Sequence, residues 1–495
     1  MPTDPRDLRS DAPLLDAWLT FQEREGHPFT IPGHKHRRDL VGDVIGGDVP
    51  LYAGLDSMKL TAGTLDAAQA AAARLWGAEA AYFSVGGSTH GNQALALAVG
   101  RPGQPILVAR NAHRSMVSAL MLGGLDPVWL LPEVDPDTGL PRGISPAQVA
   151  SALARHPDAA AVHLTDPSYV GTLGDIAGCA EVAHAAGVPL LVDAAWAAHF
   201  GFHPDLPRHA LEAGADAVVT SAHKTLPAWS QAALVLIRGD VDDGDPTPGA
   251  ASPCCRLDPA RVAAAIDATH TTSPAGAILA SIDAARALLA RDGEALLGDC
   301  LTSVSRLRAR LRGIPGLRVL DGPDVDPLKV TLVLPGTGAD GNAAEADLIA
   351  AGMPVEMADR DTLVAMVTLA DTSADLDRLG DLLVATIQRH RGAPRAVATP
   401  AAYAVVPEPA MSPRDAYFAP REPVPIEHAL GRIGAELIAP YPPGIPVLAP
   451  GERITRSVVD ALAAAREAGV RIAYAADPTL ATLLAVSEPP PTPPA

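Results

Sequence analysis

A lysine stands where a parallel sheet would present it to a ligand. The segment Ser221-Ala222-His223-Lys224-Thr225 directly follows the apolar run Asp216–Thr220, which is typical of a buried strand. Open parallel sheets bind their ligands outside the carboxyl ends of the strands. A single lysine after a strand is usually solvated, so the residues around Lys224 must decide whether it is functional.

A carboxylate ends a second apolar run. The sequence Leu190-Leu191-Val192-Asp193-Ala194-Ala195-Trp196 places Asp193 at the end of a buried strand, where an unpaired charge is costly. A protonated pyridine nitrogen would be a suitable partner, and pyridoxal-phosphate (PLP) enzymes combine such an acid with a lysine that holds the cofactor as a Schiff base. Thirty-one positions separate Asp193 from Lys224, which leaves room for one helix and one strand. A helix cap or a salt bridge is the alternative for Asp193.

A glycine-rich loop indicates a phosphate site. Ser84-Val85-Gly86-Gly87-Ser88-Thr89-His90-Gly91-Asn92 joins a predicted strand to an apparent helix at Gln93–Val99. Gly87 lets the backbone approach an anion, the helix start offers free N–H groups, and Ser88 and Thr89 add hydroxyls. The loop does not match the dinucleotide or P-loop pattern. Many turns without a ligand have a similar composition.

A histidine follows another strand-like run. In Asn111-Ala112-His113-Arg114-Ser115, the imidazole of His113 is placed to stack on a flat cofactor ring. The alternative is an ordinary histidine at a helix start.

Composition narrows the class of protein. The 495 residues carry a formal charge of −19, and 48% are hydrophobic but only 4% aromatic. This length predicts two or three domains. A nucleic-acid partner is disfavoured because phosphate binding needs a basic surface. A cationic substrate is compatible with the charge, although acidity alone often serves only solubility.

Cysteine spacing and hydropathy suggest a cytoplasmic enzyme without a metal. The four cysteines form no C-x-x-C pair and no cluster with metal-ligand spacing, so a reducing compartment is expected. The first residues contain no apolar run that would predict a signal peptide. No stretch reaches the roughly 20 apolar residues of a membrane span.

Alternating strand-like and helical stretches predict an α/β fold with a mostly parallel sheet covered by helices on both faces. Strand-like runs are Ala80–Val85, Pro105–Val108, Val128–Leu131, Ala160–Leu164, Val188–Val192, Ala217–Val219 and Ala232–Ile237. Helical stretches include Leu65–Trp76, Pro146–Arg155 and Ile176–Ala186. The predicted organisation is an arm (1–63), a large domain (64–255), a small α+β domain (256–392), a linker (393–400), a C-terminal domain (401–486) and a disordered tail (487–495).

The motifs together resemble one family, the fold-type I PLP-dependent ornithine/lysine/arginine decarboxylases. The resemblance spans about residues 25–480 and is greatest to shorter, arginine-type members. The matching segments are Pro32–Lys35, Gly86–Ser88, Asn111–Ser115, Asp193–Trp196, Ser221–Lys224 with Ser230-Gln231, Met411–Arg414, Gly431–Ile433 and Pro440–Pro446. Gly87 replaces a threonine, Arg114 replaces a lysine, and Thr165–Tyr169 departs from Asn-Pro-Thr-Tyr. Asp193–Trp196 also lacks the Glu-Ala-His of many short members and is nearer the large forms. The departures at Asp193–Trp196 and Thr165–Tyr169 bear on the substrate more than on the cofactor.

The resemblance implies a seven-stranded sheet, PLP as cofactor and a homodimer or higher homo-oligomer. It also implies residue roles: Lys224 binds the cofactor, Asp193 pairs with the ring nitrogen, and His113 and Ala195 cover the two ring faces. Ser88, Thr89, Ser221 and His223 would hold the phosphate, and Lys224 or His223 would return a proton to the substrate carbon.

The expected reaction removes CO2 from a basic amino acid: arginine first, lysine second and ornithine third. A buried carboxylate should meet the distal cation, and Glu356, Glu427 and Glu436 are candidates. An aminotransferase, a PLP lyase on another amino acid and a non-catalytic regulatory relative remain alternatives. The orientation of the substrate carboxylate would decide between loss of CO2 and loss of a proton.

Overall fold

The computed structural model describes residues 4–23, 34–35, 38–43, 46–49, 63–238, 257–398, 401–441, 444–467 and 470–487. Several sequence predictions therefore lie outside the described residues. They are the loop Gly239–Pro253, the tail Pro489–Ala495, the cysteines Cys254 and Cys255, the Pro32-Gly33 part of the N-terminal motif and the Pro442-Pro443 part of the C-terminal motif.

A mixed, mostly parallel sheet forms the centre of the large α/β unit, as predicted. In the described part of the chain it has seven strands in the order β1-β7-β6-β5-β4-β2-β3. Only β7 runs against its neighbours β1 and β6. The strands are β1 (Ala80–Ser84), β2 (Pro105–Ala109), β3 (Asp126–Leu130), β4 (Val162–Thr165), β5 (Leu190–Asp193), β6 (Ala217–Thr220) and β7 (Ala233–Ile237).

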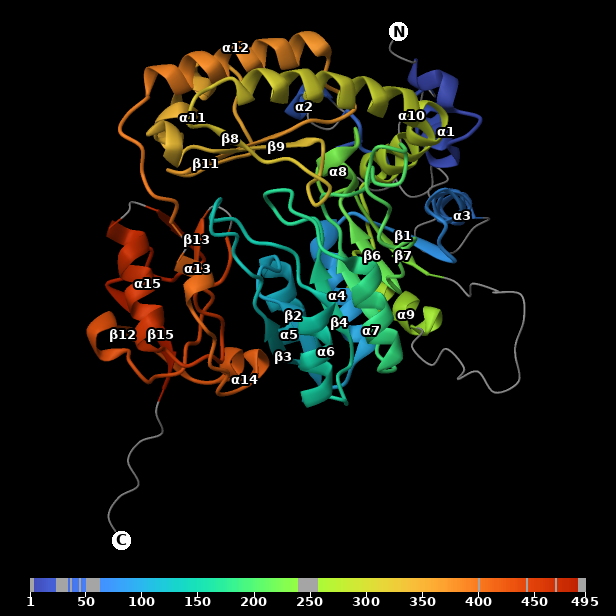
Figure 1. Ribbon diagram of the computed structural model, residues 1–495. Helices are drawn as coiled ribbons and strands as arrows, with labels where there is room; N and C mark the ends of the chain where they lie inside the picture. The colour runs from blue at the N-terminus through green and yellow to red at the C-terminus, as the bar shows by residue number, and fades with distance from the viewer. Residues whose placement is uncertain are drawn as a thin grey trace.

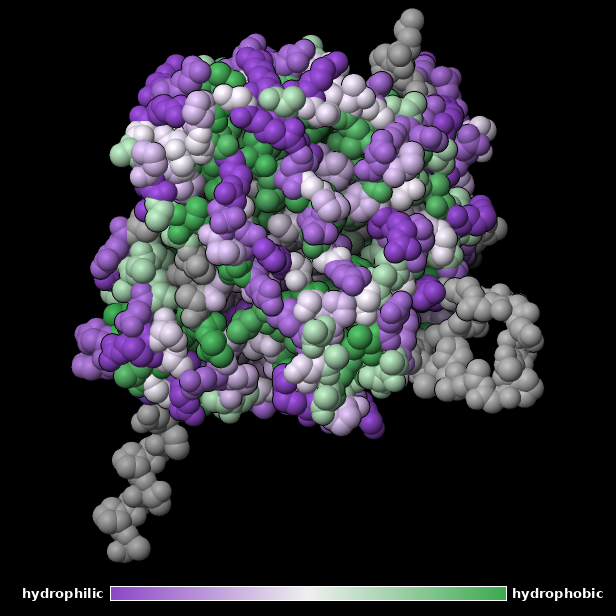
Figure 2. All heavy atoms as spheres, in the orientation of Figure 1, coloured by the Kyte–Doolittle hydropathy of each residue, from purple (hydrophilic) through white to green (hydrophobic). Residues whose placement is uncertain are grey.

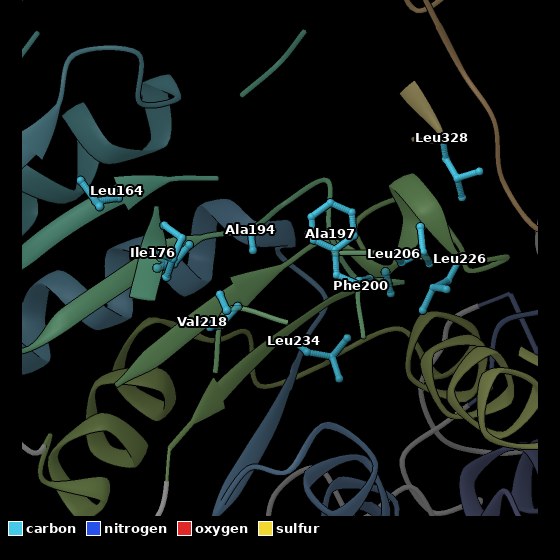
Figure 3. Close-up of a cluster of buried hydrophobic side chains, with 14 of the residues drawn as sticks. Leu164, Ile176, Ala194, Ala197, Phe200, Leu206, Val218, Leu226, Leu234 and Leu328 are labelled. Atoms are coloured by element: carbon cyan, nitrogen blue, oxygen red, sulfur yellow. The ribbon is translucent and has the colours of Figure 1, made fainter. Parts of the chain in front are cut away.

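Helices cover both faces of this sheet, because the strand side chains alternate between two cores. Leu190 and Val192 belong to one core with α3, α6 and α7, whereas Leu191 belongs to the other with α4, α5 and α9. Figure 3 shows part of the first core, including Leu164 and Val218. The helices are α3 (Thr64–Trp76), α4 (Gly87–Val99), α5 (Arg114–Gly123), α6 (Pro146–Arg155), α7 (Ile176–Ala185), α8 (Ala222–Thr225) and α9 (Pro259–Thr269).

Helix α4 begins earlier than the sequence suggested. The expected helix was Gln93–Val99, but α4 begins at Gly87, so Ser88 and Thr89 lie in its first turn rather than in a preceding loop. Polar and glycine residues disfavour a helix interior, yet they are well accommodated at its start, where N–H groups have no partner within the helix.

A second, antiparallel sheet lies beyond the large unit, with strand order β10-β11-β9-β8. The long helix α10 and helix α12 extend along it at the top of the molecule (Figure 1). Helix α1 (Pro13–Glu23) packs on α10 through Leu15 and Ala287. The elements are α10 (Gly276–Arg312), β8 (Arg318–Val319), β9 (Lys329–Val333), η4 (Pro335–Thr337), α11 (Gly341–Ala350), β10 (Met357–Ala358), β11 (Thr362–Met366) and α12 (Ser373–Arg389); η1 (Pro5–Leu8) and α2 (Arg38–Val41) precede the large unit.

The C-terminal segment forms a third unit beside β2, β3 and α5 (Figure 1). It has its own hydrophobic core, which includes Val447, Leu462 and Leu483. Its elements are α13 (Ala401–Ala404), α14 (Pro413–Phe418), β12 (Arg421–Pro425), η5 (Ile426–His428), β13 (Ala439–Tyr441), α15 (Arg456–Glu467), β14 (Arg471–Ala473) and β15 (Thr482–Val486). Figure 2 shows hydrophilic and hydrophobic residues intermixed over the visible face of the molecule. Among the described helices, none combines the length and the hydropathy of a membrane span.

Candidate active site

Asp193 and Lys224 come from neighbouring parallel strands. Asp193 ends β5 and is level with Val219 of β6, and the one-turn helix α8, which carries Lys224, begins two residues after β6 ends. Burial lowers the pKa of the Lys224 amine, whereas the carboxylates of Asp193 and Glu356 raise it. The structure therefore brings the two residues together at the carboxyl end of the sheet, where ligands of such folds bind.

The surroundings of Asp193 fit a positively charged ring nitrogen. The residue is only 2% exposed. The Asn92 amide donates to its Oδ2 at 2.8 Å and the backbone N–H of Ala195 donates to its Oδ1 at 3.2 Å. Among the described residues, no cationic side chain forms an ion pair with Asp193. A buried carboxylate with neutral partners needs such a charge nearby, and a pyridinium nitrogen would supply it.

Asn92 is a functional candidate that the sequence reasoning did not assign. Its amide donates both to Asp193 and to the Ser115 hydroxyl, the latter at 2.9 Å. The ring Nε2 of His163 lies 3.4 Å from the Asn92 oxygen. The signal in the sequence was its position four residues after Ser88, which places both side chains on one face of α4.

His113 lies at the start of α5 and near both central residues. Its Nδ1 accepts a hydrogen bond from the backbone N–H of Ser115 and lies 2.9 Å from the Ser115 hydroxyl. Burial lowers the pKa of His113, Asp193 raises it, and Lys224 lowers it. Ala195, two residues after Asp193, is also buried. This arrangement is compatible with the predicted positions of His113 and Ala195 on the two faces of a ring.

The phosphate-site candidates converge from distant parts of the sequence. The hydroxyls of Ser88, in the first turn of α4, and Ser221, directly after β6, lie 2.7 Å apart. Gly87 has φ +67°, and a Cβ at this position would meet no atom within 4 Å, so its backbone conformation, not space, favours glycine. Thr89 is exposed. Hydroxyls at a helix N-terminus suit a phosphate group.

His223 is held by the protein backbone. Its Nδ1 lies 2.9 Å from the carbonyl oxygen of Ala232 and donates to it. Burial lowers its pKa, as does the neighbouring Lys224. Since one ring nitrogen is occupied, a role in binding phosphate or moving a proton would fall to Nε2 and stays a prediction.

Two aromatic residues next to Lys224, Trp196 and Tyr169, were not assigned a function from the sequence. The Lys224 Nζ lies 3.9 Å from the centroid of the Trp196 ring, and Tyr169 packs edge-on against Trp196 at 5.3 Å. The Tyr169 hydroxyl donates to Glu356 Oε1 at 2.7 Å. Lys329, the first residue of β9, lies against the same indole with its Nζ 3.3 Å from the centroid. The signal that could have identified it is a lysine directly before the apolar run at residues 330–334.

The C-terminal unit holds the chain on both sides of His113. Arg110 at the end of β2 is 1% exposed and donates from Nη1 and Nη2 to the two carboxylate oxygens of Glu452, at 2.5 and 2.9 Å. The guanidinium of Arg114 lies 4.1 Å from the centroid of the Tyr474 ring. Arg414 donates to the carbonyls of Met121 and Leu122 at the end of α5. These contacts fix the segment that presents His113.

Comparison with known proteins identifies the architecture. The model of the Orn/Lys/Arg decarboxylase major domain matches residues 12–323, and that of the Orn/Lys/Arg decarboxylase C-terminal domain matches residues 396–472. The chain is 32% identical to an arginine decarboxylase of Bacillus anthracis and 31% identical to one of Bacillus subtilis, over 97% of this chain and 98% of each relative. It is 27% identical to a lysine decarboxylase of Pseudomonas aeruginosa, over 92% of this chain and 76% of that protein.

Solved structures support the same fold. Lysine decarboxylase A from Pseudomonas aeruginosa superposes with a TM-score of 0.79 at 21% identity, over 97% of this chain and 81% of that one. Serine palmitoyltransferase from Sphingomonas wittichii has a TM-score of 0.51 at 15% identity, over 66% of this chain and 76% of that one.

Proposed function

The chain belongs to the Orn/Lys/Arg decarboxylase family and is a PLP-dependent amino-acid decarboxylase, and from this premise we propose that it converts arginine to agmatine and CO2 with Lys224 as the cofactor lysine. The observation that carries the assignment of Lys224 is its position beside Asp193 at the ends of neighbouring parallel strands. The near-full-length similarity to arginine decarboxylases favours arginine among basic amino acids.

Different residues of the site would bind different parts of the cofactor. Asp193, fixed by Asn92, supplies the negative charge for the ring nitrogen, and Ser88 with Ser221 supplies hydroxyls for the phosphate. PLP, when bound, accepts the electron pair that the departing carboxyl group leaves on the α-carbon. A proton must then reach that carbon. Lys224 is the proposed donor, because burial lowers the pKa of its amine and thereby eases proton release at neutral pH.

Glu356 is the proposed partner for the distal cation of the substrate. Its carboxylate is held by the Tyr169 hydroxyl at 2.7 Å and is close enough to Lys224 to raise that lysine's pKa. The other two candidates are less suitable. The oxygens of Glu436 accept hydrogen bonds from the backbone N–H groups of Ala476 and Leu484, and Glu427 lies exposed in η5 of the C-terminal unit. Glu356 is itself exposed in the single chain, in contrast to the expected buried carboxylate.

We also propose a homodimer in the cytoplasm. Glu356 and Trp229, five residues after Lys224, are both exposed, the latter by 55%, and a second copy of the chain would remove such a large aromatic side chain from water. Light scattering of the purified protein should give twice the chain mass. A monomer at micromolar concentration would contradict this part of the proposal.

Product identification tests the proposed reaction. The purified protein should be incubated separately with arginine, lysine and ornithine, and agmatine, cadaverine and putrescine should be measured together with CO2. We expect agmatine to form with the highest kcat/KM. Preferential formation of cadaverine would identify lysine as the substrate, and preferential formation of putrescine would identify ornithine. Accumulation of a keto acid without CO2 would contradict decarboxylation.

Borohydride trapping tests the cofactor lysine independently of the substrate. Reduction of the yellow PLP-loaded protein should bleach its visible absorbance and leave a modified peptide that contains Lys224. A reduced adduct on another lysine, Lys329 included, would overturn the assignment.

A further inference from the structure

Lys329 is a buried cation without a hydrogen-bond acceptor. It is the first residue of β9 and is 1% exposed. Its Nζ makes no hydrogen bond to any part of the chain that the structure describes. A buried ammonium group without an acceptor is costly, so the fold keeps this charge at a cost to its own stability.

The position of Lys329 is next to the cofactor lysine. Its Nζ lies 3.3 Å from the centroid of the Trp196 ring, and the Nζ of Lys224 lies 3.9 Å from the same centroid. The two nitrogens are therefore at most 7.2 Å apart, the distance if they lay on opposite faces of the indole. Figure 3 shows Leu328 and Leu226, near neighbours of the two lysines in the sequence, in one cluster of buried side chains.

The carboxylates around Lys329 are engaged elsewhere. Asp326 Oδ1 accepts a hydrogen bond from the backbone N–H of Leu328 and lies 3.7 Å from the His199 ring. Glu356 accepts from Tyr169. Burial is the main influence on Lys329 and lowers its pKa to about 7, against the opposing effect of Asp326 and Glu356 and with a smaller lowering by Lys224. An additional anion would stabilise the charged form.

The surrounding backbone is built to admit this side chain. Gly171 has φ +86°, and a Cβ there would lie 2.8 Å from both Cβ and Cγ of Lys329. The buried Arg308 donates from Nη2 to the carbonyl oxygens of Lys329 and Asp326, at 2.8 and 3.3 Å. Both features fix the backbone and the first side-chain carbons of Lys329 in a position from which its Nζ contacts Trp196.

An amino-acid substrate would bring a carboxylate close to Lys329. In an amino acid the α-carboxylate is bonded to the same carbon as the amine that must take the place of Lys224 on the cofactor. That carboxylate must therefore lie within a few ångströms of the Lys224 amine. We propose that the Lys329 ammonium group binds the α-carboxylate of the substrate amino acid and fixes its direction relative to the cofactor ring.

This inference rests on the proposed function and adds a distinction between substrate and product. The product amine lacks the carboxylate, so it loses the contact with Lys329 and keeps only the contact of its distal cation with Glu356. Decarboxylation itself thus weakens binding at one end of the ligand, which favours product release.

The test compares ligands that differ at the carboxylate. The enzyme loaded with pyridoxamine phosphate, which cannot condense with an amine, allows arginine binding to be measured by calorimetry without turnover. We expect Lys329→Met to raise the Kd of arginine at least tenfold and that of agmatine less than twofold. Glu356→Gln, the matched control at the other end of the site, should weaken both ligands. Equal effects of Lys329→Met on arginine and agmatine, or no effect, would overturn the inference.

Two further measurements remain decisive if a variant folds poorly. Lys329→Met removes an uncompensated buried charge and should melt at the wild-type temperature or above, whereas a purely structural role for the ammonium would lower the melting temperature. The wild-type enzyme should bind arginine at least tenfold more tightly than argininamide, whose carboxylate is a neutral amide; equal affinities would contradict the proposal. If the wild type binds arginine in this way but releases none of the three expected amines, the proposed function fails and the carboxylate site stands.

Discussion

At the scale of single residues, Asp193 shows how neutral partners hold a buried carboxylate without neutralising its charge. Asn92 and the backbone N–H of Ala195 occupy one position on each carboxylate oxygen, and neither contributes a formal charge. The carboxylate is held in one orientation while its charge remains available. Orientation in advance of binding is what makes such an electrostatic contact effective.

Replacing this charge should affect the reaction far more than the fold. In Asp193→Asn the side chain keeps its shape, but the ring nitrogen loses its counter-charge. We expect kcat to fall at least a hundredfold, about 2.7 kcal/mol of activation free energy, with an unchanged circular dichroism spectrum. A decrease of less than tenfold would show that Asp193 is not the ring partner.

Asp166 gives a prediction about pH and stability. Burial raises its pKa to about 7 despite the hydrogen bond from the Gly174 N–H, and Asp326 raises it further. The folded protein therefore holds a proton that the unfolded chain releases above about pH 4, so the contribution of Asp166 to wild-type stability should fall as pH rises from about 4 to about 7.

Asp166→Asn should remove this loss. The difference in the free energy of unfolding between Asp166→Asn and the wild type should increase from pH 4 to pH 7. Above pH 7 the variant should be more stable by about 1–3 kcal/mol, as measured by urea titration at several pH values. Asp205→Asn, at an exposed position, is the control and should show no such trend. A difference for Asp166→Asn that does not change with pH would contradict the assignment.

At the scale of elements, the start of α4 and the end of β6 together form the proposed phosphate site. Ser88 and Ser221 are 133 positions apart, yet their hydroxyls lie 2.7 Å apart. Each comes from a different secondary-structure element, so the pair exists only when β1 and β6 lie at their places in the sheet. Ser88 adds its hydroxyl to the N–H groups of the first helical turn.

Removing these hydroxyls should weaken cofactor retention. Ser88→Ala should raise the Kd of PLP several-fold, and the double change Ser88→Ala with Thr89→Ala should raise it about tenfold, about 1.4 kcal/mol. The measurement is cofactor loss on dialysis with thermal unfolding of the apoprotein as the control for folding. Unchanged retention would place the phosphate elsewhere.

The ion pair between Arg110 and Glu452 is an element-scale contact between the large and C-terminal units. Glu452→Gln leaves the Arg110 charge buried and unpaired, which should cost about 3 kcal/mol of stability and weaken PLP binding through displacement of His113. The ion pair of half-buried Arg432 with exposed Glu422 is the control, since Glu422→Gln leaves Arg432 in contact with water and should cost less than about 1 kcal/mol.

A double variant separates loss of charge balance from loss of packing. Replacing both Arg110 and Glu452 by Met removes the two charges together and should recover most of the stability lost in Glu452→Gln. If the double variant is no more stable than Glu452→Gln, the unpaired charge is not the cause.

At the scale of the whole molecule, buried neutral histidines should make the fold sensitive to acid. Burial lowers the pKa of His209 to about 4 and lowers the pKa values of His90 and His163. The unfolded chain binds protons at these positions below about pH 6.5, while the folded chain does not. The contribution of these three histidines to stability should therefore fall as pH decreases from about 6.5 to about 4.

His209 can be tested because its Nε2 has no hydrogen-bond partner among the described residues. Between pH 6.5 and pH 4, the free energy of unfolding should decrease in both proteins, but by about 2–3 kcal/mol less in His209→Phe than in the wild type. Denaturant unfolding at several pH values measures both decreases. Parallel losses in the variant and the wild type would assign the acid sensitivity to other groups.

Local sequence patterns were sufficient for the fold class and the cofactor, and they supplied the proposed residues of the cofactor site. Short apolar runs predicted the strands of the large sheet. The side chains that follow those strands made Lys224, Asp193 and His113 the candidates for the site, because a side chain that follows a buried strand must lie at the edge of the sheet. The predicted start of α4, Gln93, was wrong, because the helix already begins at Gly87. Glycines and residues with hydroxyl groups are common both in the first turn of a helix and in loops.

Only the tertiary structure could bring Lys329 and Glu356 to that edge. Both belong to the segment around the second sheet, more than 100 positions after Lys224, and hydrophobic periodicity carries no information about which side chains of separate units meet. The same applies to the contact of Glu452 with Arg110. The sequence by itself determined which cofactor chemistry the chain supports, whereas packing between units decided which charged side chains lie beside Lys224, because those side chains come from segments far apart in the sequence.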